Sequence, residues 1–145
     1  MDIKYYTDKG FDFLCEFEPS NMYTQGIALK CVRKIKDNRE YYSQPGVYLL
    51  ANSKGQVLKI GQTSNMFNRI YTQYKCVNNS TNRRIREHIK TIEPVNVFVY
   101  MLPKKEATIL GHKVYTSFAG GLEHQLLKEY KTTLERLPIL NTMIR

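Results

Sequence analysis

Long apolar runs are absent from this sequence, and so are metal-binding patterns of cysteine and histidine. No apolar stretch approaches the roughly 18 residues that a membrane-spanning helix needs. The three cysteines are odd in number and far apart, without a C-x-x-C pair, and the three histidines show no spacing typical of a zinc site. These absences argue against a membrane protein and a zinc domain. They leave carboxylate as the main ligand for any metal ion, which favours a hard ion such as Mg²⁺.

Acidic residues are few compared with basic ones. Lysine and arginine number 22 against 13 aspartates and glutamates, which gives a formal net charge of +9. A charge this far from zero favours a polyanionic partner. Nucleic acid is favoured over a membrane surface because no long helix places its basic residues opposite a wide apolar face. The start, MDIKYYTDKG, is charged and has no apolar secretion segment, so we expect a cytoplasmic protein.

The length and composition predict a single domain with one core, since the chain has 145 residues, 42% of them hydrophobic, and no repeat or linker. We treat residues 1–44 as an N-terminal arm or extension of that domain and residues 45–145 as its core. In the arm, alternating apolar residues from Phe11 to Phe17 suit a strand, although a short helix is equally allowed. Residues 26–36 predict a basic helix.

From residue 45 onward, hydrophobic periodicity and turn residues predict most elements. Two strands form a hairpin, a helix starts at Ser64 or Asn65, and a basic helix starts at Thr81 or Asn82. An apolar strand then forms the centre of a sheet, followed by a second small hairpin around Gly111 and a long helix. The expected ranges are 46–51, 56–61, 67–74, 83–92, 95–101 and 118–134. This order predicts a small α+β layer structure.

The first hairpin carries two residues that are unusual in a buried strand, Tyr48 and Lys59. A four-residue loop, Asn52 to Gly55, would pair residues whose numbers sum to 107, so Tyr48 would lie opposite Lys59. Facing Cβ atoms in such a pair are roughly 4.5 to 5.5 Å apart. An ammonium at that distance would favour the phenolate form of the tyrosine and make it a base. The alternative is an ordinary tyrosine beside a lysine that extends to solvent.

Two further charged residues are candidates for the same site. Arg69 lies beside the apolar face of the helix that follows the hairpin. Glu123 shares the core-facing side of the last helix with Leu126, Leu127 and Tyr130, where a carboxylate is rare unless it is paired with a cation or metal. A tyrosine, a lysine, an arginine and a glutamate suit phosphodiester hydrolysis, which needs a base, a cation for the phosphate and a bound metal.

The order and spacing of these residues resemble the GIY-YIG nuclease superfamily. Gly46-Val47-Tyr48 matches the first motif with Val for Ile, and Lys59-Ile60-Gly61 matches the second with Lys where most members have Tyr. KIG in place of YIG, together with FLCEFEPSN, STN and the run VFVYMLPKKEATILGHKVYTSFAGGLE, is similar to the small Type II restriction endonucleases of that superfamily.

The resemblance implies a central three-stranded antiparallel sheet flanked by helices, here with the N-terminal arm and an extra small hairpin. It implies that Tyr48 acts as general base, that Lys59 polarises the tyrosine and the water, and that Arg69 contacts the scissile phosphate. Glu123 would bind a single Mg²⁺, or Mn²⁺ in its place. Gln62 stands where related proteins often carry His or Lys, and a glutamine there cannot act as a cationic acid. Asn141 matches a polar position near the end of the domain.

The expected function is therefore Mg²⁺-dependent, sequence-specific cleavage of double-stranded DNA by a homodimeric restriction enzyme. A homing, repair or structure-selective nuclease is one alternative, and a catalytically silent DNA-binding protein is another. We expect polar and basic residues of the basic helix at 83–92 and of the predicted catalytic site to contact DNA. For any one of them, a position on a solvent-exposed basic face without DNA contact is an equally favoured alternative. These residues are Gln62, Asn82, Arg83, Arg84, Arg86, Lys90 and Asn141.

Overall fold

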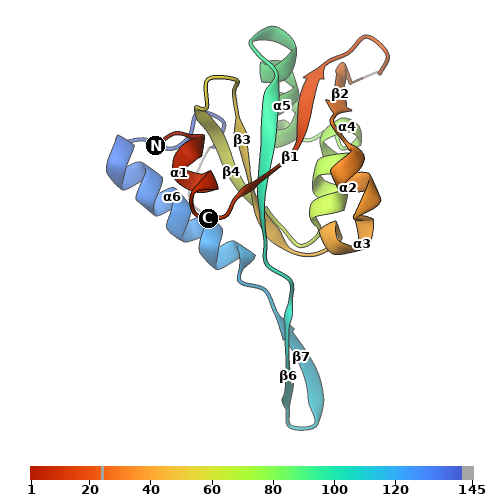
Figure 1. Ribbon diagram of the computed structural model, residues 1–145, viewed down its shortest axis with the longest axis vertical. Coiled ribbons are helices and arrows are strands. Elements are labelled where there is room, and N and C mark those ends of the chain that lie inside the picture. Colours follow the sequence, from red (N-terminus) through yellow and green to blue (C-terminus); the bar gives the residue numbers. More distant parts are fainter. Residues whose placement is uncertain (24, 142–145) are drawn as a thin grey trace.

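A computed structural model describes residues 1–23 and 25–141 of the chain. Its body is a five-stranded antiparallel sheet between two layers of helices, with strand order β2-β1-β5-β3-β4 (Figure 1). The strands are β1 (Asp12–Pro19), β2 (Ile27–Lys30), β3 (Gly46–Ala51), β4 (Val57–Thr63) and β5 (Val95–Met101). The α+β class is confirmed, with β5 at the centre as predicted. The sheet has two strands more than expected, because the N-terminal arm supplies β1 and β2.

The two faces of the sheet carry separate apolar clusters. One cluster joins the sheet to α2 (Arg33–Asp37), η1 (Asn68–Gln73), α4 (Tyr74–Cys76) and α5 (Ser80–Thr91), and its members include Tyr48, Ile70 and Tyr74. The other lies beneath α1 (Ile3–Thr7) and α6 (Ala119–Leu134) and includes Val47, Leu127 and Tyr130. The short helix α3 (Arg39–Tyr42) leads into β3. Alternate residues of β3 therefore serve opposite layers, which is why the strand is buried along its whole length.

The predicted helix over residues 26–36 is wrong in its first half. Residues Ile27–Lys30 form β2, and only Arg33–Asp37 are helical. Pairing with β1 decides the outcome, and Lys30 strengthens it with an ion pair to Glu18 at 2.8 Å. Cys31 follows with a left-handed φ of 57°, which separates the strand from the helix. The alternation in β1 is that of a strand, interrupted by a bulge between Phe13 and Cys15.

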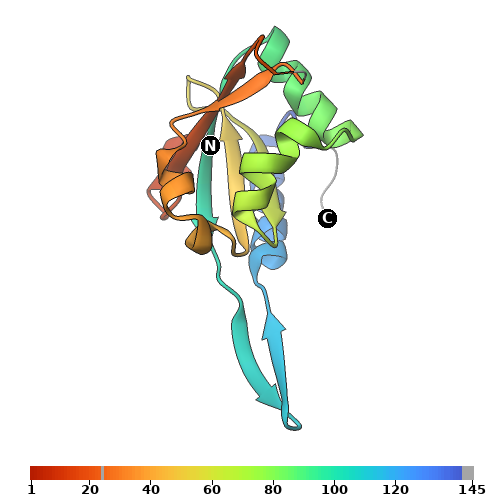
Figure 2. The ribbon, with the colours of Figure 1, turned by 90° about the vertical axis from the view of Figure 1, so that its right-hand side faces the viewer.

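The second hairpin, β6 (Lys105–Ile109) and β7 (His112–Thr116), projects away from the body along the long axis of the molecule (Figures 1 and 2). Every residue of its two strands is exposed. The turn lies at Leu110 and Gly111, as the glycine predicted. In the described part of the chain, no helix combines the length and apolarity needed to cross a membrane.

Candidate active site

The register of the first hairpin differs from the predicted one. Tyr48 lies opposite Gly61, and Lys59 lies opposite Leu50. The turn is one residue longer than expected, since the last pair is Ala51 with Val57, and a bulge beyond it shifts the pairing by one more residue. A shift of one residue moves a side chain to the opposite face of the sheet, so two such shifts return Lys59 to the face that carries Tyr48. Tyr48 and Lys59 are therefore diagonal neighbours on one face of the sheet, not a directly facing pair.

Gly61 makes room for the ring of Tyr48. A Cβ atom built on Gly61 would lie 2.9 Å from Cε1 of Tyr48 and 2.5 Å from its hydroxyl oxygen, closer than real atoms approach. The tyrosine ring therefore crosses directly over the glycine backbone. The glycine of the second motif is explained by this close approach, since its backbone has no unusual φ angle.

Tyr48, Lys59, Arg69 and Glu123 all line one cleft of about 380 Å³ beside β4. Lys59 and Glu123 are charged residues with little exposure, at 8% and 5%. Glu123 reaches the cleft because α6 packs on β3 and β4 through Leu126 and Leu127, one turn further along. The structure thus brings together the four residues predicted to be catalytic. Among the residues that the structure describes, the others that line the cleft are Gly61, Gln62, Thr63, Ser64, Gln73, Asn79, Thr81, Leu127, Leu140 and Asn141.

Arg69 points from η1 toward the hydroxyl of Tyr48. Its Nε donates a hydrogen bond to that oxygen at 3.3 Å, and its guanidinium lies 4.1 Å from the centre of the Tyr74 ring. Burial alone would lower the pKa of Arg69, but the neighbouring Tyr48 and Tyr74 outweigh it, and the pKa is raised above its usual value. The side chain therefore stays a cation within the cleft.

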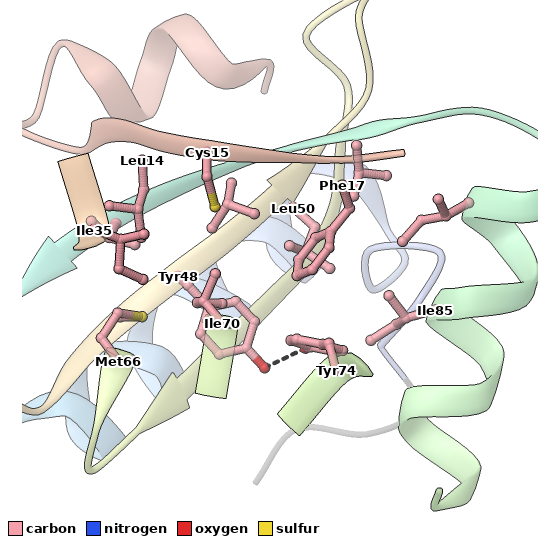
Figure 3. Packing of buried hydrophobic residues seen from close by; sticks show 14 of the residues in the cluster. Leu14, Cys15, Phe17, Ile35, Tyr48, Leu50, Met66, Ile70, Tyr74 and Ile85 are labelled. Carbon is pink, nitrogen blue, oxygen red and sulfur yellow. Dashed lines mark hydrogen bonds between the residues drawn. The ribbon is translucent and has the colours of Figure 1, made fainter. Parts of the chain in front are cut away.

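Two residues of this site were missed by sequence reasoning. Tyr74 was assigned only to the apolar face of its helix, yet its hydroxyl oxygen lies 2.7 Å from that of Tyr48 (Figure 3). Asn82 was assigned to DNA, yet its Oδ1 accepts a hydrogen bond from Arg69 Nη1 at 3.0 Å. The signal for Tyr74 was a hydroxyl at a fully buried position, which needs a partner. The π-helical turn that brings Arg69 to Tyr74 left no recognisable pattern in the sequence.

The predicted DNA contacts divide into two groups. Arg83, Arg84 and Lys90 are exposed on α5, and Gln62 is exposed on β4. Asn82 and Arg86 are 0% and 4% exposed, so their side chains offer little surface to DNA, and their contact with DNA stays a prediction. Arg86 Nη1 donates to the carbonyl oxygens of Tyr74 and Val77 at 2.9 and 3.0 Å and holds the turn before α5. That helix begins earlier than expected, with Asn79 as its N-cap.

Asn141 closes the outer edge of β4. Its amide accepts a hydrogen bond from the backbone N–H of Ile60 at 2.8 Å and donates one to the carbonyl of Ile60 at 2.9 Å. The N–H of Leu140 donates to the carbonyl of Leu58 at 2.8 Å. These bonds pair the edge strand with the end of the described chain and fix one wall of the cleft. A contact between Asn141 and DNA stays a prediction.

Comparison with known proteins finds likeness in structure only. No protein-family model matches the sequence, and no curated protein matches it. Among solved structures, restriction endonuclease HPY188I in complex with product DNA superposes with a TM-score of 0.60 at 19% identity, covering 99% of this chain and 87% of that one. A mutant of bacteriophage T4 EndoII superposes with a TM-score of 0.72 at 16% identity, covering 98% of this chain and all of that one. The chain shares the fold of these two proteins.

Proposed function

We propose that this protein is a Mg²⁺-dependent endonuclease that hydrolyses phosphodiester bonds of double-stranded DNA. The observation that carries the proposal is the meeting of Tyr48, Lys59, Arg69 and Glu123 around one cleft, from β3, β4, η1 and α6. A phenol hydroxyl, two cations and a carboxylate are the groups that this reaction needs. The shared fold adds support, because one of the two similar structures is a restriction endonuclease with product DNA.

In the proposed reaction, Tyr48 takes the proton of the attacking water. In that step the Tyr48 oxygen would act as a phenolate, whose charge hydrogen-bond donors such as Arg69 Nε are placed to stabilise. Lys59, the diagonal neighbour of Tyr48, assists by stabilising negative charge on the tyrosine and the water. Arg69 is positioned to stabilise the charge that develops on the phosphate oxygens, and its raised pKa keeps it cationic throughout the reaction.

Glu123 is the residue that would hold a metal ion. It is the one carboxylate among the described residues that line the cleft, and those residues contain no cluster of three or more His, Cys, Asp or Glu side chains. A single carboxylate suits Mg²⁺, which keeps several waters and binds substrate phosphate instead of demanding a full protein cage. When bound, the ion would neutralise phosphate charge and stabilise the leaving oxygen.

Double-stranded DNA is the favoured substrate. The net charge of +9 and the exposed Arg83, Arg84 and Lys90 on α5 support binding to a polyanion. Cutting both strands with one site per chain needs two copies, so we infer a homodimer and a role as a restriction enzyme. A homing, repair or structure-selective nuclease would use the same chemistry. The four intact site residues disfavour a catalytically silent protein.

The proposal is tested by incubating the purified protein with supercoiled plasmid in Mg²⁺ and in EDTA. Cleavage in Mg²⁺ alone is expected, and sequencing the cut ends would identify any recognition site. Glu123→Gln should abolish cleavage and leave the Kd for DNA within a few-fold of the unmodified protein. A Glu123→Gln variant that cuts at the full rate would remove this residue from the metal site. No cleavage by the unmodified protein on any duplex would overturn the proposal.

A further inference from the structure

Asn82 lies in the first turn of α5, a place where side chains are usually exposed, yet its own exposure is 0%. Both protons of its amide nitrogen have backbone acceptors, the carbonyl oxygens of Gln73 at 3.1 Å and Val77 at 3.0 Å. Those carbonyls belong to the end of η1 and to the residue after α4. The two bonds fix the orientation of the amide, which leaves Oδ1 directed at Arg69.

The side chain of Asn82 is not required to cap the helix. The N-cap is Asn79, whose Oδ1 accepts the hydrogen bond from the backbone N–H of Asn82 at 2.8 Å. The buried amide of Asn82 therefore has a role other than capping. Its oxygen accepts a hydrogen bond from the guanidinium of Arg69.

Arg69 has a long side chain whose guanidinium must be held still to act on a phosphate. Four contacts locate it: Nη1 with Asn82 at 3.0 Å and, more weakly, with Oε1 of Gln73 at 3.4 Å, Nε with Tyr48, and the face of its guanidinium against the Tyr74 ring. An amide oxygen can hold this cation without neutralising it, whereas a carboxylate in the same place would cancel its charge. Asparagine is thus the side chain that fixes the arginine and preserves its attraction for a phosphate.

We propose that Asn82 is a positioning residue for phosphodiester hydrolysis, which sets the place of the Arg69 guanidinium beside Tyr48 while leaving its charge available to the substrate. This proposal rests on the proposed nuclease function. It assigns to the start of α5 a part in catalysis through Arg69, in place of the DNA contact that its polar sequence suggested.

The test combines a double-mutant cycle with a measurement that does not depend on activity. Asn82→Ala should slow single-turnover cleavage about 10- to 100-fold, and the same change should cause no further loss in an Arg69→Ala background. Asn52→Ala is the matched control. It removes another buried amide, at 5% exposure, that bonds to the β3–β4 turn, and it should keep the original rate.

The second measurement is the Nε–H signal of Arg69 in a ¹⁵N NMR spectrum, identified by its loss in Arg69→Lys. It should be sharp in the unmodified protein and in Asn52→Ala, and broadened in Asn82→Ala. Asn82→Asp keeps the side-chain volume, but its carboxylate neutralises Arg69 and cannot donate to the carbonyls of Gln73 and Val77, so it should cleave at least 10-fold more slowly.

Three results would overturn the proposal: an unbroadened signal in Asn82→Ala, an equal loss of rate in the Arg69→Ala background, or full activity in Asn82→Asp. The NMR result decides alone if Arg69→Ala has no measurable rate. If the unmodified protein cuts no DNA, the nuclease function fails, and the NMR result still shows whether Asn82 fixes Arg69.

Discussion

The hydroxyl oxygens of Tyr48 and Tyr74 lie 2.7 Å apart, and both side chains are buried. Burial raises the pKa of Tyr74 well above 10, and the neighbouring Tyr48 raises it further, while Arg69 opposes both effects. Tyr74 therefore stays a phenol at neutral pH and can donate its proton to the oxygen of Tyr48. A second tyrosine thus supports the first from a helix, although the second motif on β4 carries Lys59.

Removing the hydroxyl of Tyr74 should impair catalysis without unfolding the protein. Tyr74→Phe keeps the ring that packs against Arg69 and loses the bond to Tyr48, which stabilises a charged oxygen by about 1.5–3 kcal/mol. We expect the single-turnover rate to fall about 10- to 100-fold. Tyr130→Phe is the control, since Tyr130 is buried on the opposite face of the sheet. Equal rates for both variants would show that the bond does not contribute.

Adding one methyl group at Gly61 should displace Tyr48. The new Cβ in Gly61→Ala would overlap the tyrosine ring and hydroxyl, so Tyr48 must rotate away. We expect loss of cleavage and a decrease of about 1–3 kcal/mol in the free energy of unfolding, measured in urea. Gly120→Ala places the same methyl group in open space on α6 and should leave the rate unchanged. Full activity in Gly61→Ala would mean that the position of Tyr48 tolerates this shift.

Exposed and buried basic residues of α5 should respond differently to mutation. Arg83→Gln and Lys90→Gln should each weaken DNA binding and reduce the slope of log Kd against log salt by about 0.9, as expected for one lost phosphate contact. Arg86→Gln should instead lower the melting temperature, because it removes the bonds to Tyr74 and Val77. Lys128→Gln, on α6, serves as the exposed control. If the slope of log Kd against log salt is unchanged in both Arg83→Gln and Lys90→Gln, DNA does not bind along this face of α5.

The protein should lose stability in alkali. Burial raises the pKa of Tyr6, Tyr74 and Cys15, so these groups stay neutral in the folded state while the unfolded chain ionises near pH 9 to 10. Their contribution is complete below pH 9 and is lost as the pH rises, by up to about 1.4 kcal/mol per pH unit for each group. Tyr6→Phe should flatten this decline in urea unfolding between pH 9 and 11. Equal declines in the unmodified protein and in Tyr6→Phe would show that ionisation of Tyr6 does not cause the loss of stability.

Local patterns in the sequence predicted those elements whose hydrophobic periodicity fits one type of secondary structure. The apolar run at residues 95–101 predicted the central strand, and the spacing from Glu123 to Tyr130 identified both α6 and the inward carboxylate. Residues 26–36 carry a pattern that a helix and a strand both satisfy, and pairing between β1 and β2 decided between them. That pairing joins two consecutive strands across residues 20–26, and the propensities of residues 26–36 alone did not reveal it.

The residues around the proposed catalytic set were less predictable than the set itself. Tyr48 and Lys59 share a face as expected, but through a register that includes a bulge, which depends on packing beyond the hairpin. Asn82 stood in a polar, basic stretch typical of a surface. Its burial is explained by its partners in three dimensions, which are the carbonyls of Gln73 and Val77 and the guanidinium of Arg69. The roles of Tyr74 and Asn82 arise from the π-helical turn of η1, which composition and spacing did not reveal.

The most direct test of the account is the single-turnover rate of Tyr48→Phe on plasmid DNA in Mg²⁺, measured beside the Kd for the same DNA. The variant removes one oxygen atom and keeps the ring that crosses Gly61. The account predicts a rate at least about 100-fold lower, with a Kd within a few-fold of the unmodified protein. A Tyr48→Phe protein that cuts DNA at the original rate would contradict the assignment of the cleft as a tyrosine-based nuclease site.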